Sequence, residues 1–388
     1  QAAAAQAAHD VIRAVYTSPS LALDNLITTT YNTQLAAIAD GAAKTKGIAL
    51  GQQVAQTIVN LRTNDGHDSA MNYTLGGNPG DWKPTGPDFS MPYGPEWYNV
   101  TPWTMTSADQ FRPGIPYGYA TMADLLASPE YAAAYNDVRE KGGLANTGLT
   151  TLTRTQEEAD IASFWANDRD GTYKPPGHLN DIAKVLANMH NLGLHDEARL
   201  FALLNLAMTD AGIAAWDQKY GTEFDLWRPY TGINEGDTDG NGLTISDPDW
   251  EPFSSDPSIN GFTPPFPAYV SGHATFGAAA SAIFRNFFGT DVMTFWIGTD
   301  DPGYTGAMLR EYHSFTDIAL ENGRSRVYLG VHWQFDADYG YLLGTALGDQ
   351  VFAKFGRPVP EPVTATLSLL SMGALGLAAL RRRRTPAV

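Results

Sequence analysis

HDEARLFALLNLAMTDAGIAAWDQ, residues 195–218, places apolar side chains on nearly every side of the helix that it would form. A helix that is apolar all round is buried among other helices. Two later stretches have the same character: 274-ATFGAAASAIFRNFFG-289, which is rich in small residues, and 332-HWQFDADYGYLLGTALGDQVFAKFG-356. We therefore predict a mainly α fold of bundled helices, with two four-helix-bundle-like halves.

Outside these helices, the chain alternates between helical and loop-like segments. The stretch 33-TQLAAIADGAAKTKGIALGQQVAQTIVNLR-62 shows no strand-like alternation and predicts helices. Residues 66–120 are rich in Gly, Pro and aromatic residues, which predicts a long loop that is packed down by its aromatic side chains or is functional. At 153-TRTQEEADIASFWA-166, a Thr followed by a Glu pair is typical of a helix start. No series of β-hairpins is expected.

Composition narrows the classes of function. The 388 residues carry a formal net charge of −17, so general attraction to nucleic acid is not expected. There is no cysteine, which excludes disulfides and thiolate metal sites. Any anion site must therefore be a local basic pocket within an acidic protein.

Three distant stretches supply the residues for such a pocket. They are 219-KYGTEFDLWRP-229, 264-PPFPAYVSGHATFG-277 and 325-SRVYLGVHWQFD-336. Together they bring Arg, Lys, His and Ser side chains and a Gly amide at an expected helix start, a set that suits a tetrahedral oxyanion. Each stretch alone also has a simpler interpretation: an Arg-Pro helix boundary, a Ser-Gly-His turn with an N-cap, and a local His–Asp hydrogen bond.

The three stretches resemble the signature of the vanadium-dependent haloperoxidases, in particular the chloroperoxidase-type branch. That family shares its pocket with type 2 phosphatidic acid phosphatases and bacterial acid phosphatases. The stretch 164-FWANDRDGTYKPP-176 also fits, and the resemblance covers roughly residues 8–356. It implies one helical domain over residues 1–356, with an N-terminal part (1–150) and an anion-pocket part (151–356).

The resemblance also implies roles for individual residues. His332 would ligate vanadium, and His273 would be the acid–base residue. Asp336 would orient His332, Asp168 would support the second histidine with Asp170 as a rival, and Phe266 would line the halide side. The vanadate oxygens would be held by Lys219, Arg228, Ser271, Gly272 and Arg326. Lys219 would also be catalytic, because it would polarise the bound peroxide.

Two positions depart from the family pattern. Lys219 and Arg228 are nine positions apart, where the family usually has seven. The extra residues would form a bulge, or Lys219 would miss the pocket. Val270 stands before Ser271, where the family usually has Pro.

The implied activity is oxidation of halide by hydrogen peroxide with a vanadate cofactor. It would produce hypohalous acid and then halogenated organic acceptors. One alternative is an acid phosphatase, in which His332 forms a phosphohistidine and His273 protonates the leaving alcohol. A second alternative is an inactive cell-surface protein of a biofilm matrix.

The C-terminal residues 357–388 read as a sorting tail. Pro360-Glu361-Pro362, an uncharged run over residues 363–380 and an Arg cluster resemble the bacterial PEP-CTERM signal. The run is long enough for a single transmembrane segment. The resemblance implies recognition by an exosortase and export to the cell envelope or extracellular matrix, with no other contact with a membrane. The start of the chain, QAAAAQAAHD without Met, fits removal of a signal peptide or a shortened chain.

A smaller signal lies at 235-EGDTDGNGLTISDPDW-250. Asp237, Asp239 and Asn241, with Gly242, match the front half of an EF-hand loop, but the twelfth position is Pro248. The stretch is either a polar turn or a calcium site.

Overall fold

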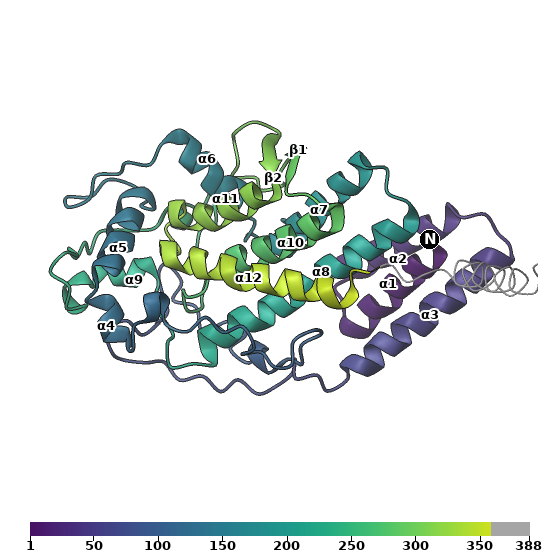
Figure 1. The fold of residues 1–388 in the computed structure, drawn as a ribbon, viewed down its shortest axis with the longest axis horizontal. Coiled ribbons are helices and arrows are strands. Elements are labelled where there is room, and N and C mark those ends of the chain that lie inside the picture. The colour runs from purple at the N-terminus through teal and green to yellow at the C-terminus, as the bar shows by residue number, and fades with distance from the viewer. Residues whose placement is uncertain (358–388) are drawn as a thin grey trace, which may run out of the picture.

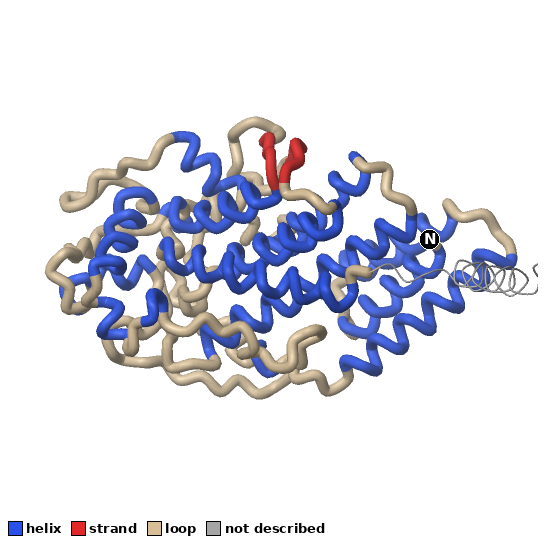
Figure 2. Tube along the Cα trace, viewed as in Figure 1, coloured by secondary structure: helices blue, strands red, loops and turns tan. Residues whose placement is uncertain are grey.

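The computed structural model describes residues 1–357 and has a mainly α fold, as predicted (Figure 1). Helices dominate the tube in Figure 2, and one small pair of strands lies on the surface. The α-helices are α1 (Ala2–Val15), α2 (Leu21–Ala36), α3 (Ala42–Arg62), α4 (Met122–Leu126), α5 (Pro129–Lys141), α6 (Gln156–Phe164), α7 (Lys174–Met189), α8 (Leu194–Tyr220), α9 (Pro229–Asn234), α10 (Gly272–Phe288), α11 (Phe315–Tyr328) and α12 (Gln334–Phe355). Short 3-10 turns cover Trp97–Asn99, Pro116–Gly118, Gly236–Thr238 and Phe253–Ser255, and the strands are β1 (Val292–Ile297) and β2 (Arg310–Ser314).

The central bundle consists of α8, α10, α11 and α12, with α10 in contact with the other three. Glycines at every fourth position of α12 let it approach α10 closely. A Cβ added at Gly344 would lie 2.1 Å from the carbonyl oxygen of Thr275. Two segments that the sequence predicts as helices, of which that of α10 is rich in small residues, therefore form a very close contact in the bundle.

Helix α8 is the buried central helix that its composition predicts. Its side chains Leu204, Ala211 and Ala215 have no exposed surface. Among the described residues, it is the one helix long and apolar enough to cross a membrane by length and composition, and 61% of its apolar window is buried inside the protein. Its apolar character is accounted for by the core of the bundle.

The N-terminal helices form a group at one end of the molecule (Figure 1). Helix α1 packs against α3 and, less extensively, against α2. Gly51 of α3 allows a close crossing, because an added Cβ would lie 2.5 Å from the carbonyl oxygen of Ala3. The helices predicted for this end of the chain are thus present as a small bundle.

The long loop over residues 66–120 is packed down, as expected, and is interrupted by two 3-10 turns. Asp210, fully buried on α8, accepts hydrogen bonds from the backbone N–H groups of Trp103 and Thr104, both at 2.8 Å. Trp82 is also fully buried. The loop is therefore fixed to the central helix at several points.

The predicted start of α6 is confirmed, whereas the two strands were not predicted. Thr155 and Glu158 form the predicted capping box at the start of α6. The hairpin of β1 and β2 was not predicted; it is antiparallel and pairs Phe295 with Tyr312. The two strands are joined by a long connection without the short Asn-Gly type of turn that marks a hairpin in a sequence.

The predicted sorting tail, including the span at residues 363–380, lies outside the described residues except for its first position. The division of residues 1–356 at position 150 remains a prediction.

Candidate active site

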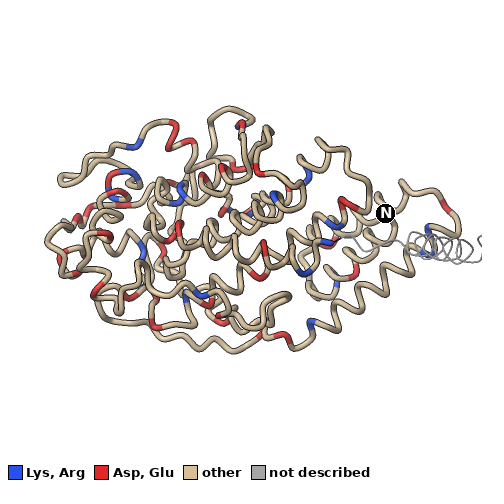
Figure 3. The backbone as a smooth tube through the Cα atoms, viewed as in Figure 1, with Lys and Arg blue, Asp and Glu red and all other residues tan. Residues whose placement is uncertain are grey.

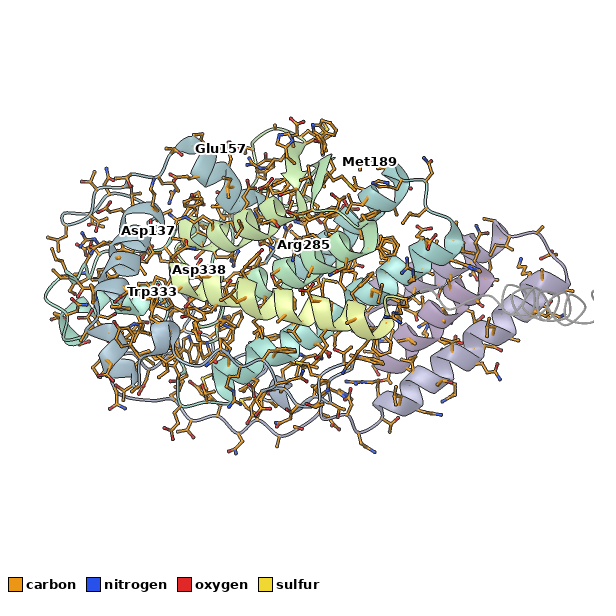
Figure 4. The ribbon with its side chains drawn as sticks, in the orientation of Figure 1. Asp137, Glu157, Met189, Arg285, Trp333 and Asp338 are labelled. Atoms are coloured by element: carbon orange, nitrogen blue, oxygen red, sulfur yellow. The ribbon has the colours of Figure 1, made fainter. Side chains whose placement is uncertain are left out.

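The three sequence stretches meet at the N-terminus of α10. Ser271 is the N-cap of this helix, and its Oγ accepts a hydrogen bond from the backbone N–H of Ala274 (3.4 Å). The backbone N–H of Ser271 donates to the carbonyl oxygen of Asp336 in α12 (2.9 Å). Figure 4 labels Trp333 and Asp338 at the N-terminal end of α12, and His332 directly precedes Trp333 in the chain. Gly272 is the first residue of α10, as expected for a helix amide that faces an anion.

Arg228 reaches the pocket from the N-terminus of α9 and has no exposed surface. Its Nε donates to the carbonyl oxygen of Phe266 (2.8 Å), and its Nη1 donates to that of Val331 (2.7 Å). Nη1 also lies 3.0 Å from Nε2 of His332. Nη2 is buried and has no hydrogen-bond partner. The guanidinium is thus held firmly, with one nitrogen available for a ligand.

His332 is oriented by Asp336. Its Nδ1 lies 2.9 Å from Oδ2 of the carboxylate, which also accepts the backbone N–H of Trp333 (3.0 Å). Both side chains are almost completely buried. Because a carboxylate accepts hydrogen bonds, Nδ1 carries the ring proton and Nε2 keeps its lone pair.

Arg326, Asp168 and His273 form a second linked group at the site. Arg326 Nη2 donates to Asp168 Oδ2 (2.7 Å), while Arg326 Nε and Nη1 are buried without partners. Asp168 Oδ1 lies 4.0 Å from Nε2 of His273. His273 Nε2 is also 3.2 Å from the carbonyl oxygen of Ala166, so this nitrogen carries the proton and Nδ1 is free to accept one. Asp170 is fully exposed and pairs with Lys174 instead.

Lys219 lies in the last turn of α8 and has no exposed surface. Its Nζ donates to the carbonyl oxygens of Pro267 (2.6 Å) and Ala268 (2.9 Å). One of the three hydrogens of the ammonium group therefore remains for a ligand. It also lies 5.2 Å from the ring centroid of Phe266. The structure therefore places Lys219 beside the pocket, and the extra residues that follow it form a loop after the helix end.

The buried charges of the pocket perturb one another. Burial, reinforced by the charge of Arg228, lowers the pKa of Lys219 well below its ordinary value. Burial and the neighbouring cations likewise lower the pKa of His332, and they lower that of His273 to about 3. Both histidines are therefore neutral near pH 7.

The carboxylates respond differently. Burial raises the pKa of Asp336. Burial also acts to raise the pKa of Asp168, but the charge and hydrogen bond of Arg326 lower it overall.

This donor set fits a tetrahedral oxyanion such as vanadate or phosphate. Three buried guanidinium nitrogens, Nη2 of Arg228 and Nε and Nη1 of Arg326, have no acceptor in the protein. An unpaired buried donor is costly, and an anion would satisfy all three. The neighbouring side chains supply no acceptor for these three nitrogens. Acidic residues are nevertheless spread over the rest of the molecule (Figure 3).

Comparison with known proteins identifies the family. A model of the VCPO second helical-bundle domain matches residues 199–360. The vanadium chloroperoxidase of Curvularia inaequalis is 30% identical over 304 residues, which are 66% of this chain and 48% of that protein. The crystal structure of a bacterial vanadium-dependent iodoperoxidase matches with a TM-score of 0.64 and 30% identity, covering 80% of this chain and 69% of the other. The chain belongs to the vanadium haloperoxidase family.

Two further facts set the extent of this likeness. The structure of a holo-type bacterial vanadium-dependent chloroperoxidase matches with a TM-score of 0.67, covering 92% of this chain and 82% of the other; at 18% identity it shows a shared fold. This haloperoxidase-family chain spans about half the length of the Curvularia protein.

One aromatic residue of this site was not singled out from the sequence. Trp216 packs against Phe266 with ring centroids 5.0 Å apart, and the Phe266 ring lies 4.7 Å from Arg228 Cζ. Trp216 precedes Lys219 by three positions, so both lie on the same face of α8. That spacing is the signal that could have found it.

The EF-hand-like loop is closed by its own hydrogen bonds. Asp239 accepts from the backbone N–H of Asn241 (2.8 Å) and from the hydroxyl of Thr244 (2.8 Å). The side-chain amide of Asn241 donates to the carbonyl oxygens of Leu126 and Ser128. Within residues 1–357, no group of three or more His, Asp or Glu side chains is arranged to hold a metal ion. Calcium binding at Asp237, Asp239 and Asn241 stays a prediction.

Proposed function

We propose that this chain oxidises halide with hydrogen peroxide, using vanadate as its cofactor, and thereby halogenates organic acceptors. The observation that carries the proposal is the set of unpartnered guanidinium nitrogens of Arg228 and Arg326 beside His332, whose Nε2 carries no proton and lies 3.0 Å from Arg228 Nη1. The family relationship supports it, because the similar proteins are named as vanadium-dependent chloroperoxidases and iodoperoxidases.

Different pocket residues would bind the vanadium atom and the vanadate oxygens. His332 Nε2 would be the ligand to vanadium, because Nδ1 is engaged by Asp336. The oxygens would be held by Lys219, Arg228, Ser271, the Gly272 amide and Arg326. When bound, vanadate supplies Lewis-acid activation of peroxide without a change in its own oxidation state. Preorganised buried cations stabilise the negative charge of the oxyanion more strongly than they could in water.

His273 moves the proton. Its neutral ring has Nδ1 free, so it can accept a proton from incoming peroxide and later return it to the departing oxygen. Asp168 stabilises the imidazolium form through its carboxylate. Phe266 and Trp216 would form the apolar side on which halide approaches.

The activity is tested on the full chain supplied with orthovanadate. We expect peroxide-dependent oxidation of bromide or iodide that requires vanadate and is lost in His332→Ala. Hydrolysis of p-nitrophenyl phosphate without vanadate is measured in parallel. Phosphate release without halide oxidation would move the chain to the acid phosphatase alternative. A folded protein that binds no vanadate and is inactive in both assays would favour the second alternative, an inactive matrix protein.

We also propose that residues 357–388 are a sorting tail that an exosortase recognises, with a membrane span at residues 363–380. The supporting observation is the order of Pro360-Glu361-Pro362, an uncharged run and an Arg cluster. Export would place the enzyme in the cell envelope or extracellular matrix. The test is fractionation of cells that carry the wild-type chain or Glu361→Ala; retention of the variant in the inner membrane supports the proposal, and equal distribution contradicts it.

A further inference from the structure

A cavity of about 340 Å³ lies beside the anion pocket. Four aromatic side chains line it: Tyr93, Trp97, Trp216 and Phe276. Small-molecule sites typically have volumes of about 300–1,000 Å³ and mainly apolar walls with a few polar groups. This cavity has both the size and the lining of such a site, for a ligand of one or two rings.

Trp216 connects the cavity to the chemistry. It lines the cavity and packs against Phe266, which in turn lies next to Arg228 and Lys219. Gly272, at the start of α10, is equally close: a Cβ built on it would lie 3.7 Å from the Trp216 ring. One layer of aromatic side chains therefore separates the cavity from the oxyanion donors.

The outer wall is tied to the site by the long loop. The backbone N–H of Tyr93 donates to the carbonyl oxygen of Pro265 (2.9 Å), in the segment that carries Phe266. Trp216 Nε1 lies 3.4 Å from the carbonyl oxygen of Tyr93. The wall is thus held in position relative to the pocket.

Glu96 supplies a polar group in this aromatic surrounding. It lines the cavity, and its Oε2 atom is buried without a hydrogen-bond partner. A buried carboxylate oxygen that lacks a donor is unfavourable, so a ligand with an O–H or N–H group would be bound preferentially. His67, at the same cavity, is already engaged with Asp65 through Nδ1 (2.7 Å).

We propose that this cavity binds the organic acceptor, a planar aromatic molecule with a ring-borne hydrogen-bond donor, such as a phenol or an indole. The inference rests on the proposed haloperoxidase function. The acceptor would be held about one side-chain layer from the place where hypohalous acid forms. In the transfer, a carbon–halogen bond forms, the oxygen–halogen bond of hypohalous acid breaks, and the proton displaced from carbon leaves with the hydroxide as water.

The direct test is equilibrium dialysis of 2-naphthol against the full chain without vanadate, peroxide or halide. We expect saturable binding by the wild type, weakened by about tenfold in Glu96→Gln, because a hydrogen bond to a charged carboxylate becomes a weaker one to a neutral amide oxygen. 2-Methoxynaphthalene, which lacks the donor, should bind both forms equally. Glu223→Gln is the matched control, because this exposed carboxylate lies outside the cavity.

A second variant tests the aromatic wall. Trp97→Ala removes contact area without removing the carboxylate, so it should weaken the binding of both naphthalene compounds by a similar factor. Circular dichroism melting of each variant checks that the fold is kept.

A turnover assay then links binding to catalysis. In vanadate-loaded protein with bromide and peroxide, the two acceptors compete, and the ratio of their kcat/KM values gives the preference. We expect the wild type to prefer 2-naphthol and Glu96→Gln to lose about tenfold of that preference.

The outcomes separate this inference from the proposed function. Absence of saturable 2-naphthol binding, or equal binding by wild type and Glu96→Gln, overturns the acceptor site whether or not the enzyme oxidises halide. If halide oxidation fails while the dialysis result holds, the proposed function is wrong and the aromatic binding site remains.

Discussion

Arg326 donates one hydrogen bond to Asp168 and keeps its other two buried nitrogens unpaired. The same carboxylate lies 4.0 Å from His273. A single acidic side chain thus orients a cation for the oxyanion and supports the histidine that moves protons. The pocket remains electropositive. Within the described residues, Asp168 and Asp336 are the two carboxylates that contact its cationic and histidine side chains.

Replacing Asp168 by Asn should lower kcat for halide oxidation by about 10- to 100-fold, a size typical of partners that orient active-site groups. The loss follows from a misplaced Arg326 and an unsupported His273. Steady-state kinetics measure it, with Asp170→Asn as the matched control. An equal loss in both variants, or no loss in Asp168→Asn, would show that Asp168 has no such role.

Replacing Asp336 by Asn should weaken vanadate binding by about 10- to 100-fold, because His332 loses the partner that fixes its ring and tautomer. Equilibrium dialysis with orthovanadate gives the affinity. Asp338→Asn is the control: this residue is two positions further along α12, is exposed, and accepts from Gln334. The assignment of His332 as ligand fails if Asp336→Asn binds vanadate as tightly as Asp338→Asn does.

Acid should destabilise the vanadate-free protein through His273. Its pKa is about 3 in the folded state, against an ordinary value of about 6.5 when unfolded. Between these values the unfolded chain binds more protons, so the free energy of unfolding falls as the pH falls. Relative to His273→Gln, the wild type should lose about 2 kcal/mol between pH 7 and pH 5. Urea unfolding at both pH values measures this, and parallel curves for the two proteins would refute the lowered pKa.

Replacing Gly344 by Val should destabilise the protein by about 1–3 kcal/mol, because the added side chain overpacks the contact between α12 and α10. Chemical denaturation gives the change in free energy of unfolding. Gly148→Ala is a suitable control, since no heavy atom lies within 4 Å of its added Cβ. Similar stability of the two variants would contradict the close approach of the helices.

The sequence predicted the features that depend on local patterns. Their apolar composition located α8 and α10, and the Thr155–Glu158 signature located the start of α6. The hairpin of β1 and β2 escaped because its pairing spans a long connection. Local patterns do not predict contacts between residues that are distant in the sequence. The choice between Asp168 and Asp170 therefore needed the structure, because it depends on the contact of Asp168 with Arg326.

The site was predictable as a set of residues but not as a geometry. Spacing could not show that Lys219 stays buried beside Arg228 despite its longer separation in sequence, since that depends on how the loop after α8 folds. Nor could it show which guanidinium nitrogens are left without partners. Those unpaired donors, and the orphan oxygen of Glu96, arise only when distant segments pack together.

The central claim is that the buried cation cluster binds one vanadate through His332 and becomes active by doing so. The most direct measurement is a titration of the vanadate-free full chain with orthovanadate, followed by bromide oxidation at saturating peroxide. The account predicts that activity rises linearly and levels off at one vanadate per chain, and that His332→Ala stays inactive throughout. Activity that does not depend on vanadate, or a His332→Ala variant that titrates like the wild type, would contradict it.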